Sequence, residues 1–267
     1  MAGQQMTKHK ISRYGWIPDL PDARDHLYAA PLRVLSTLPT KVDLRSQCPT
    51  AVYDQGQLGS CTGNSIAGAV EFERIKQSLP SAQQLIPSRL FIYYNERVIE
   101  GTIPQDSGAQ IRDGIKSVAT QGVCFESGPD AWPYDVAKFA TPPPAACYEL
   151  ALRNKIVQYS RLVQVLSQLK GCLADGYPFV FGFTVYQSFE SQEVASTGVV
   201  PMPTPSEPAI GGHAVLAVGY DDSTQRFIVR NSWGPGWGMS GYFTIPYGYV
   251  SDSNLADDLW TIRMAAS

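Results

Sequence analysis

The sequence has little charge, and this shortage limits the partners that the protein can have. Lys and Arg total 21 residues against 24 Asp and Glu, so the net charge is −3 and charged residues make up 17% of the chain. Nucleic-acid-binding proteins carry a basic patch, and anionic membrane surfaces attract runs of Lys and Arg. The sequence has neither feature. We therefore expect no nucleic-acid partner and no membrane partner.

Long apolar runs are also missing. No stretch approaches the roughly 20 consecutive apolar residues that a membrane-spanning helix requires. The first ten residues lack the apolar core of a secretory signal, so the sequence leaves open whether the protein is exported. With 267 residues, of which 44% are hydrophobic, the chain can bury a substantial core, and we expect a globular protein.

Histidine is scarce. The three histidines are His9, His26 and His213, and none of them stands at a metal-ligand spacing from the cysteines. A phosphate-binding glycine-rich loop is absent as well. The sequence therefore predicts no metal and no other cofactor. It also leaves His213, in the strand-like run 211–220, as the histidine that can serve a catalytic site in the body of the chain.

The stretch 55–64, Gln-Gly-Gln-Leu-Gly-Ser-Cys-Thr-Gly-Asn, places a thiol just before a run with helical periodicity. A helix N-terminus and a nearby imidazolium both lower the pKa of a cysteine, and the thiolate is the form that attacks a carbonyl carbon. Cys61 is therefore the candidate nucleophile, and His213 is its candidate partner.

A third motif, Asn-Ser-Trp-Gly, begins at Asn231. Taken singly, each feature has a plainer interpretation. A lone cysteine is usually inert core, a lone histidine on a strand is usually a satisfied polar group, and Asn-Ser is often a turn. Taken together and in this order, Cys61, His213 and Asn231 favour a catalytic site.

The order of Gln55, Cys61, His213 and the Asn-Ser-Trp-Gly motif resembles that of the papain-like cysteine peptidases, in particular a bacterial type with a short N-terminal extension. The resemblance runs from about residue 38 to the end of the chain. It implies an α+β fold with two lobes, one helical and one an antiparallel β-barrel-like lobe, and an active site in the cleft between them. The expected divisions are an arm over 1–37, a helical lobe over 38–150 and a β-rich lobe over 151–267.

The resemblance also implies a role for each motif residue. Cys61 and His213 would form a thiolate–imidazolium pair, and Asn231 would orient the imidazole. Gln55 would donate to the oxyanion, and Trp233 would shield the histidine. Four further positions are expected to bind substrate on a weaker match to the family, and these are Gly59, Ser107, Gly108 and Gly212.

The sequence departs from the family in two places beside the nucleophile. Leu58 replaces a cysteine that usually forms a disulfide, and Thr62 replaces a common tryptophan. The resemblance favours a secreted or periplasmic location, but the first departure removes the usual evidence for an oxidising compartment. Two disulfides and four buried thiols remain open alternatives for the other cysteines, which are Cys48, Cys124, Cys147 and Cys172.

We therefore expect a monomeric cysteine endopeptidase that hydrolyses polypeptides through a thioester acyl-enzyme. A catalytically weak binding domain with this fold and a cysteine-dependent acyl transferase are the alternatives. The arm over 1–37 contains Tyr14, Trp16 and Leu20, which are too apolar for a solvated tail. It either covers the cleft, as the pro-segment of a zymogen, or packs on the outside of the domain.

Periodicity predicts the main elements. Helices are expected over 61–75, 87–97, 109–120 and 160–175. Strands are expected over 178–185, 214–220, 226–230 and 242–245, with a hairpin joining the second and third of these.

Overall fold

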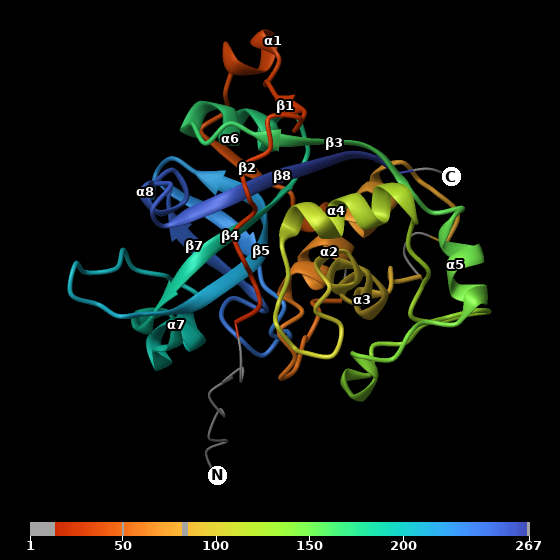
Figure 1. The fold of residues 1–267 in the computed structure, drawn as a ribbon. Helices are drawn as coiled ribbons and strands as arrows, with labels where there is room; N and C mark the ends of the chain where they lie inside the picture. Colours follow the sequence, from red (N-terminus) through yellow and green to blue (C-terminus); the bar gives the residue numbers. More distant parts are fainter. Residues whose placement is uncertain (1–13, 50, 82–84, 266–267) are drawn as a thin grey trace, which may run out of the picture.

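The computed structural model describes residues 14–49, 51–81 and 85–265, and in it most helices precede most strands (Figure 1). The helices are α1 (Leu32–Leu35), α2 (Cys61–Lys76), α3 (Arg89–Glu100), α4 (Ile111–Thr120), α5 (Ala145–Ala151), α6 (Leu166–Ala174), α7 (Gln192–Thr197) and α8 (Tyr247–Val250). The strands are β1 (Leu27–Tyr28), β2 (Lys41–Asp43), β3 (Ile156–Leu162), β4 (Phe179–Tyr186), β5 (Ala209–Asp221), β6 (Arg226–Arg230), β7 (Tyr242–Pro246) and β8 (Ala256–Ala265).

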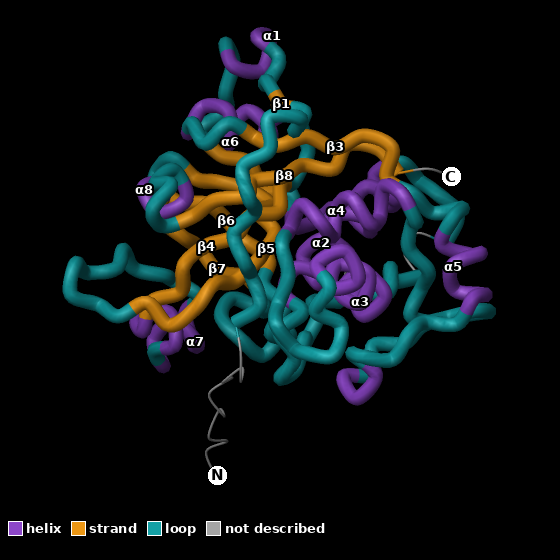
Figure 2. Tube along the Cα trace, viewed as in Figure 1, coloured by secondary structure: helices purple, strands orange, loops and turns teal. Residues whose placement is uncertain are grey.

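The strands join in one mixed sheet of order β1-β3-β8-β4-β5-β6-β7, with β2 paired to β5. The pairing of β1 with β3 is parallel, and the other pairings are antiparallel. Among the described residues the path ends at β1 and β7 and does not close into a barrel. Figure 2 shows α2, α3 and α4 gathered beside this sheet. The expected α+β fold, with a helical part and a strand-rich part, is confirmed.

Helix α2 is the central element of the helical part. It packs against α3 and α4 on one side and against β5 and β8 on the other. Because it is covered on both sides, it is buried from Cys61 through Arg74 and has no solvent-facing stripe. A helix enclosed in this way is a rigid support for the residue at its start, which is Cys61.

Helices α3 and α4 lie where periodicity predicts them. The Ser88 side chain accepts a hydrogen bond from the Phe91 N–H (3.1 Å) and caps the start of α3. Gly101 ends α3 in the left-handed conformation at φ 70°. The helix expected over 160–175 is wrong in its first part. Residues 160–162 belong to strand β3, which pairs with β8 and β1, and the helix begins only at Leu166.

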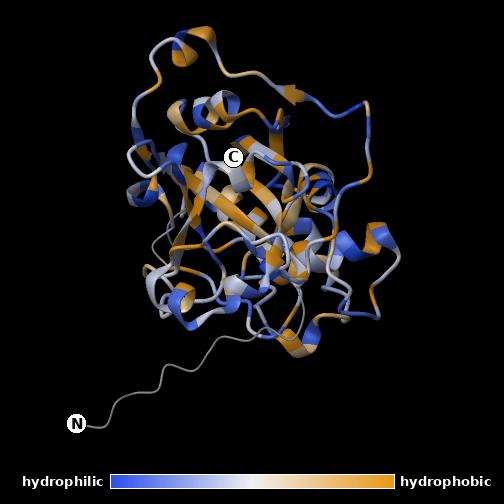
Figure 3. Ribbon diagram, turned by 90° about the vertical axis from the view of Figure 1, so that its left-hand side faces the viewer, coloured by the Kyte–Doolittle hydropathy of each residue, from blue (hydrophilic) through white to orange (hydrophobic). Residues whose placement is uncertain are grey.

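The sheet supplies most of the apolar core. Figure 3 shows the interior strands coloured mainly as hydrophobic, and the aromatic side chains of Phe179, Phe181 and Phe183 on β4 are fully buried. None of the helices in the described ranges is long and apolar enough to cross a membrane.

The arm passes between the two parts of the molecule. Figure 1 shows its first described residues, in red, running between the sheet and the helices α2 and α4 before the chain reaches β1. Trp16 is only 9% exposed, whereas Leu20 is 72% exposed. The arm is therefore fixed by its first described residues, which lie inside the molecule, and not by Leu20. His9 lies outside the described residues.

Candidate active site

Cys61 is the first residue of α2 and is fully buried. The backbone N–H groups of Ala214, Gly15 and Thr62 face its sulfur and act to lower the pKa of Cys61. Burial outweighs them and raises the pKa of Cys61 to about 12. Burial of the sulfur therefore favours the neutral thiol over the thiolate while the arm residue Gly15 lies beside it.

His213 on β5 contacts Asn231, which directly follows β6. The His213 Nε2 atom and the Asn231 Oδ1 atom are 2.8 Å apart. The Ser232 N–H also donates to Asn231 Oδ1 (2.9 Å), so this atom is the acceptor oxygen and His213 Nε2 must carry the proton. This tautomer leaves the other ring nitrogen, Nδ1, as the one that can exchange a proton with the thiol.

Trp233 lies over the imidazole of His213, with ring centres 5.1 Å apart and planes inclined by 33°. Phe183, Phe189 and the arm residue Tyr14 also pack against the imidazole, with ring centres 5.8, 6.4 and 6.1 Å from it. His213 is fully buried as a result. A hydrogen bond shielded from water in this way is stronger than one at the surface, so the aromatic side chains hold the imidazole in a fixed orientation.

Gln55 is buried, and Ser232 links it by hydrogen bonds to Asn231, the residue that contacts His213. The Ser232 hydroxyl donates to Gln55 Oε1 (2.6 Å), and the Gln55 N–H donates to the Ser232 carbonyl (2.9 Å). The Gln55 Nε2 group donates to the Leu58 carbonyl (3.0 Å). Ser232 was not among the expected site residues, although it lies inside the Asn-Ser-Trp-Gly motif. The hydrogen bonds of Ser232 connect Gln55 and Asn231.

The arm occupies the space beside Cys61 and pairs with the chain on both sides of it. The Trp16 N–H donates to the Gly212 carbonyl (2.9 Å). The Ala109 N–H donates to the Gly15 carbonyl (2.8 Å), and the Ile17 N–H donates to the Ala109 carbonyl (3.0 Å). Ala109 therefore binds an extended peptide by its backbone in the parallel direction. Backbone recognition does not depend on the side chain, so this residue could not be identified from the sequence.

Three of the four positions predicted to bind substrate lie against the arm. A Cβ atom at Gly15 would be 1.8 Å from the Gly59 carbonyl oxygen, and one at Gly108 would be 2.2 Å from the Gly15 oxygen. Gly212 accepts the hydrogen bond from Trp16 described above. Ser107, in contrast, donates only to the Gly108 carbonyl (3.0 Å) among its described hydrogen bonds. The glycines are therefore required where two backbones approach closely.

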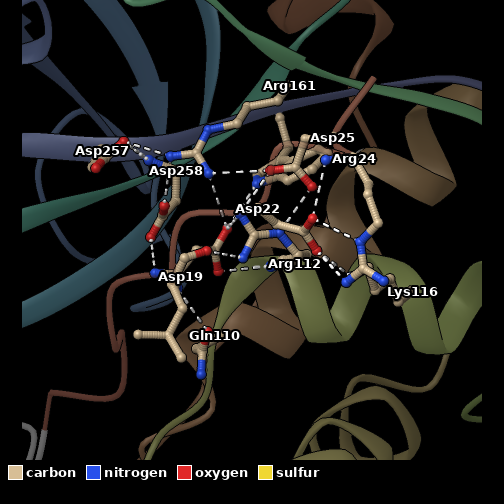
Figure 4. Close-up of polar contacts among 12 residues, drawn as sticks. Asp19, Asp22, Arg24, Asp25, Gln110, Arg112, Lys116, Arg161, Asp257 and Asp258 are labelled. Atoms are coloured by element: carbon tan, nitrogen blue, oxygen red, sulfur yellow. Dashed lines mark hydrogen bonds and ion pairs between the residues drawn. The ribbon is translucent and has the colours of Figure 1, made fainter. Parts of the chain in front are cut away.

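Charged side chains hold the next part of the arm (Figure 4). The arm carboxylates of Asp19, Asp22 and Asp25 face the cationic side chains of Arg112, Lys116 and Arg161. The Arg112–Asp25 pair is the shortest of these at 2.7 Å, and both side chains are largely buried. A buried, two-pronged Arg–carboxylate pair fixes geometry as well as charge, so it anchors the arm in one position.

The remaining cysteines are described as free thiols, and all of them are buried. Within the ranges that the structure describes, no group of three or more His, Cys, Asp or Glu side chains is placed to hold a metal ion.

Comparisons with known proteins agree with this geometry. A family model described as papain family cysteine protease matches residues 38–261. An uncharacterised peptidase C1-like protein of Acanthamoeba polyphaga mimivirus is 43% identical over 97% of this chain and 89% of its own length. The crystal structure of xylellain, a cysteine protease from Xylella fastidiosa, is 46% identical, with a TM-score of 0.87 over 98% of this chain and 99% of that chain.

A procathepsin B from Trypanosoma congolense shares the fold, with a TM-score of 0.71 at 20% identity over 92% of this chain and 84% of that one. The family model spans most of the chain, and two relatives match nearly its full length. The chain therefore belongs to the papain family of cysteine proteases and is a papain-like cysteine peptidase, a hydrolase with the two-lobed fold of that family.

Proposed function

We propose that the protein is a cysteine endopeptidase that cleaves polypeptides through Cys61, His213 and Asn231, and that its arm keeps it latent. One observation carries the proposal. The Cys61 sulfur faces the backbone N–H of Ala214, the residue after His213, and His213, Asn231 and Gln55 are linked by hydrogen bonds through Asn231 and Ser232. These residues lie beside the arm, which is held in extended form by backbone hydrogen bonds. A site that already binds an extended peptide next to a thiol is suited to cleaving one.

Catalysis would begin when the arm leaves and water reaches the sulfur. Cys61 then loses its proton to His213 Nδ1, since Nε2 already carries the proton that it shares with Asn231. The thiolate attacks a substrate carbonyl and forms a tetrahedral oxyanion. The Cys61 backbone N–H and the second N–H of the Gln55 amide are the proposed donors, and losing one such donor raises the barrier by ~3 kcal/mol.

His213 then protonates the leaving amine, which breaks the peptide bond and leaves a thioester on Cys61. A water molecule, deprotonated by the same imidazole, hydrolyses the thioester and restores the thiol. Asn231 keeps the ring in the orientation that both steps require. A neutral amide is sufficient for this role because its oxygen needs only to accept one hydrogen bond from the imidazole N–H.

Latency rests on what the arm presents to the sulfur. The Gly15 N–H faces Cys61, while the Gly15 carbonyl accepts a hydrogen bond from the Ala109 N–H. The arm thus fills the site with its Gly15 carbonyl oxygen engaged by Ala109. It also contributes to the burial that raises the pKa of Cys61 to about 12, so the nucleophile is protonated while the arm is in place.

The test compares the full chain with a protein that begins at Leu38, using peptide libraries and Cys61→Ala as the blank. We expect peptide hydrolysis that depends on Cys61 and that increases when the arm is removed. Equal turnover by the two proteins would exclude latency, and no turnover by either would exclude the peptidase. Product formation that depends entirely on an added amine would instead identify an acyl transferase.

A further inference from the structure

The loop that precedes Cys61 is held by the side chain of Asp106. The Gly59 N–H donates to both carboxylate oxygens of Asp106, at 3.0 and 3.1 Å. Because Leu58 cannot form a disulfide, hydrogen bonds take on the task of fixing this loop. A hydrogen bond to a charged acceptor is roughly twice as strong as one between neutral groups. Asp106 is therefore a strong anchor for the residue two positions before the nucleophile.

Helix α3 fixes Asp106 in turn. The Tyr93 hydroxyl donates to Asp106 Oδ1 (2.6 Å) and accepts from the Gly108 N–H (3.1 Å). One turn further along α3, the Arg97 guanidinium donates to the carbonyl of Gln105 (3.1 Å), the residue directly before Asp106. Tyr93 and Arg97 are both fully buried, and burial raises the pKa of Tyr93, so its hydroxyl keeps the proton that it donates. The carboxylate therefore has one fixed position.

The peptide unit between Leu58 and Gly59 lies between two side chains. Its N–H donates to Asp106, and its carbonyl accepts from the Gln55 Nε2 group (3.0 Å). The N–H and the carbonyl of a peptide unit lie in one plane and point in opposite directions, so a rotation that breaks one of these hydrogen bonds also breaks the other. A charged acceptor on the N–H also polarises the carbonyl and strengthens it as an acceptor. Asp106 therefore helps to set the orientation of the Gln55 amide.

The orientation of the Gln55 amide decides where its second N–H points. The amide oxygen accepts from the Ser232 hydroxyl (2.6 Å), and one N–H donates to the Leu58 carbonyl. The second N–H is the donor proposed above for the oxyanion. A donor stabilises an oxyanion only when it is aimed at the position where the charge develops. Rotation of the Leu58 carbonyl would draw the amide with it and misdirect the second N–H.

We propose that Asp106 is a positioning residue for the oxyanion donor Gln55 and that it acts through the peptide unit between Leu58 and Gly59. The inference rests on the proposed peptidase function and adds a residue to its machinery. The other role open to Asp106 is to shape the groove that binds the peptide, since Tyr93 contacts both Asp106 and Gly108. That role would change KM, whereas a misdirected donor lowers kcat and kcat/KM by the same factor.

The test uses the full chain with Gly15→Ala as the parent, because a Cβ atom there would lie 1.8 Å from the Gly59 carbonyl oxygen and prevent docking of the arm. In this parent, Asp106→Ala should lower kcat about tenfold with KM little changed. Asp106→Asn keeps one acceptor oxygen and should lower kcat only about threefold. Asp221→Ala is the matched control, since this carboxylate at the end of β5 also accepts a backbone N–H, from Ser223 (2.9 Å), and its loss should leave kcat unchanged.

A double-mutant cycle tests the path through Gln55. Once Gln55→Ala has removed the amide, adding Asp106→Ala should lower kcat by less than about twofold, because two residues that act as a unit are not additive. The cycle is repeated with Asp106→Asn, whose loss should likewise disappear, so that the test does not depend on the stability of one variant. A tenfold loss both with and without Gln55 would overturn the inference, as would a change in KM alone.

The labelling of Cys61 by iodoacetamide separates the oxyanion from the nucleophile. Alkylation joins the sulfur to a saturated carbon and expels iodide, so no oxyanion forms and Gln55 is not required. Each variant should therefore be labelled within about twofold of the parent rate. A tenfold slower labelling in both Asp106 variants would show that Asp106 supports the nucleophile itself and would overturn the inference. A parent that is labelled at Cys61 but hydrolyses no peptide would instead refute the proposed function.

Discussion

A single methyl group at Gly15 should activate the enzyme. A Cβ atom there would lie 1.8 Å from the Gly59 carbonyl oxygen and 2.4 Å from its carbonyl carbon, whereas ordinary contacts begin at 3.4 Å. Both atoms are main chain, and the Gly59 N–H is held by the Asp106 carboxylate (3.0 Å), so neither side can move aside cheaply. Gly15→Ala therefore cannot dock the arm as the native chain does.

The size of the effect follows from the cost of overpacking. Extra atoms forced into a well-packed site cost about 1–3 kcal/mol, and the rigid backbone on both sides of Gly15 puts this site at the upper end. A loss of ~3 kcal/mol in docking free energy raises the ratio of open to docked arm about 150-fold. Peptide turnover and the labelling of Cys61 should rise together by that factor, unless the arm becomes fully open first.

Labelling with iodoacetamide at mildly acidic pH, followed by mass spectrometry, measures the effect at each cysteine. The other four cysteines are buried thiols and serve as internal references. Leu20→Ala is the matched control, because this arm side chain is 72% exposed. Labelling of Cys61 in Gly15→Ala at the native rate, with the references unlabelled, would refute the claim that close approach to Gly59 holds the arm in place.

Three further predictions concern the site and its support. Asn231→Ala removes the acceptor that orients His213, and kcat/KM should fall about tenfold to a hundredfold with KM little changed in steady-state assays of the arm-deleted protein. Desolvation, and then the Asp19 charge, raise the pKa of Asp258 to about 7. This docked-state pKa lies above the ordinary carboxylate value, so the contribution of Asp258, which accepts a hydrogen bond from the arm residue Trp16, favours docking at low pH and is lost as the pH rises through 7. The protection of the arm's backbone amides against hydrogen exchange, corrected for intrinsic rates, should decrease as the pH rises through 7. An increase would contradict the role given to Asp258. Glu96 is fully buried and accepts a hydrogen bond from the Thr62 hydroxyl (2.7 Å). Burial raises the pKa of Glu96 well above the usual value, so the neutral acid is favoured. Glu96→Gln should therefore lower the free energy of unfolding, measured in urea, by less than about 1 kcal/mol, and Glu96→Ala should lower it by about 2 kcal/mol or more. Equal losses in the two variants would show that the hydrogen bond of the neutral side chain is unimportant.

Periodicity and motif order predicted the supports of the site. Helix α2 begins at Cys61, as the apolar run after it indicated, and α3 and α4 lie within a few residues of their expected ranges. Asn231 contacts His213 although 18 positions separate them, because β5 and β6 are paired strands. These features depend on local signals or on a short hairpin, which a sequence displays directly.

The contacts that hold the arm against the body of the protein could not be predicted to the same degree. The contact of Trp16 with Asp258 joins residues 242 positions apart, and the local sequence around either residue does not predict it. The partner of the arm at Ala109 is a backbone N–H and C=O, which any residue could supply. The helix expected over 160–175 is wrong at its start, where residues 160–162 belong to strand β3, because pairing with the neighbouring strands overrides a weak local pattern.

The high pKa of Cys61 has a consequence for the chemical durability of the enzyme. Oxidation to sulfenic acid and beyond requires an exposed thiolate, and a catalytic cysteine poised for attack is by the same property the most easily oxidised. In this structure the sulfur is fully buried, burial raises its pKa, and the Gly15 N–H faces it. A protein held in this form should therefore survive peroxide that would inactivate its opened counterpart, so the segment proposed to silence the nucleophile would also preserve it until use.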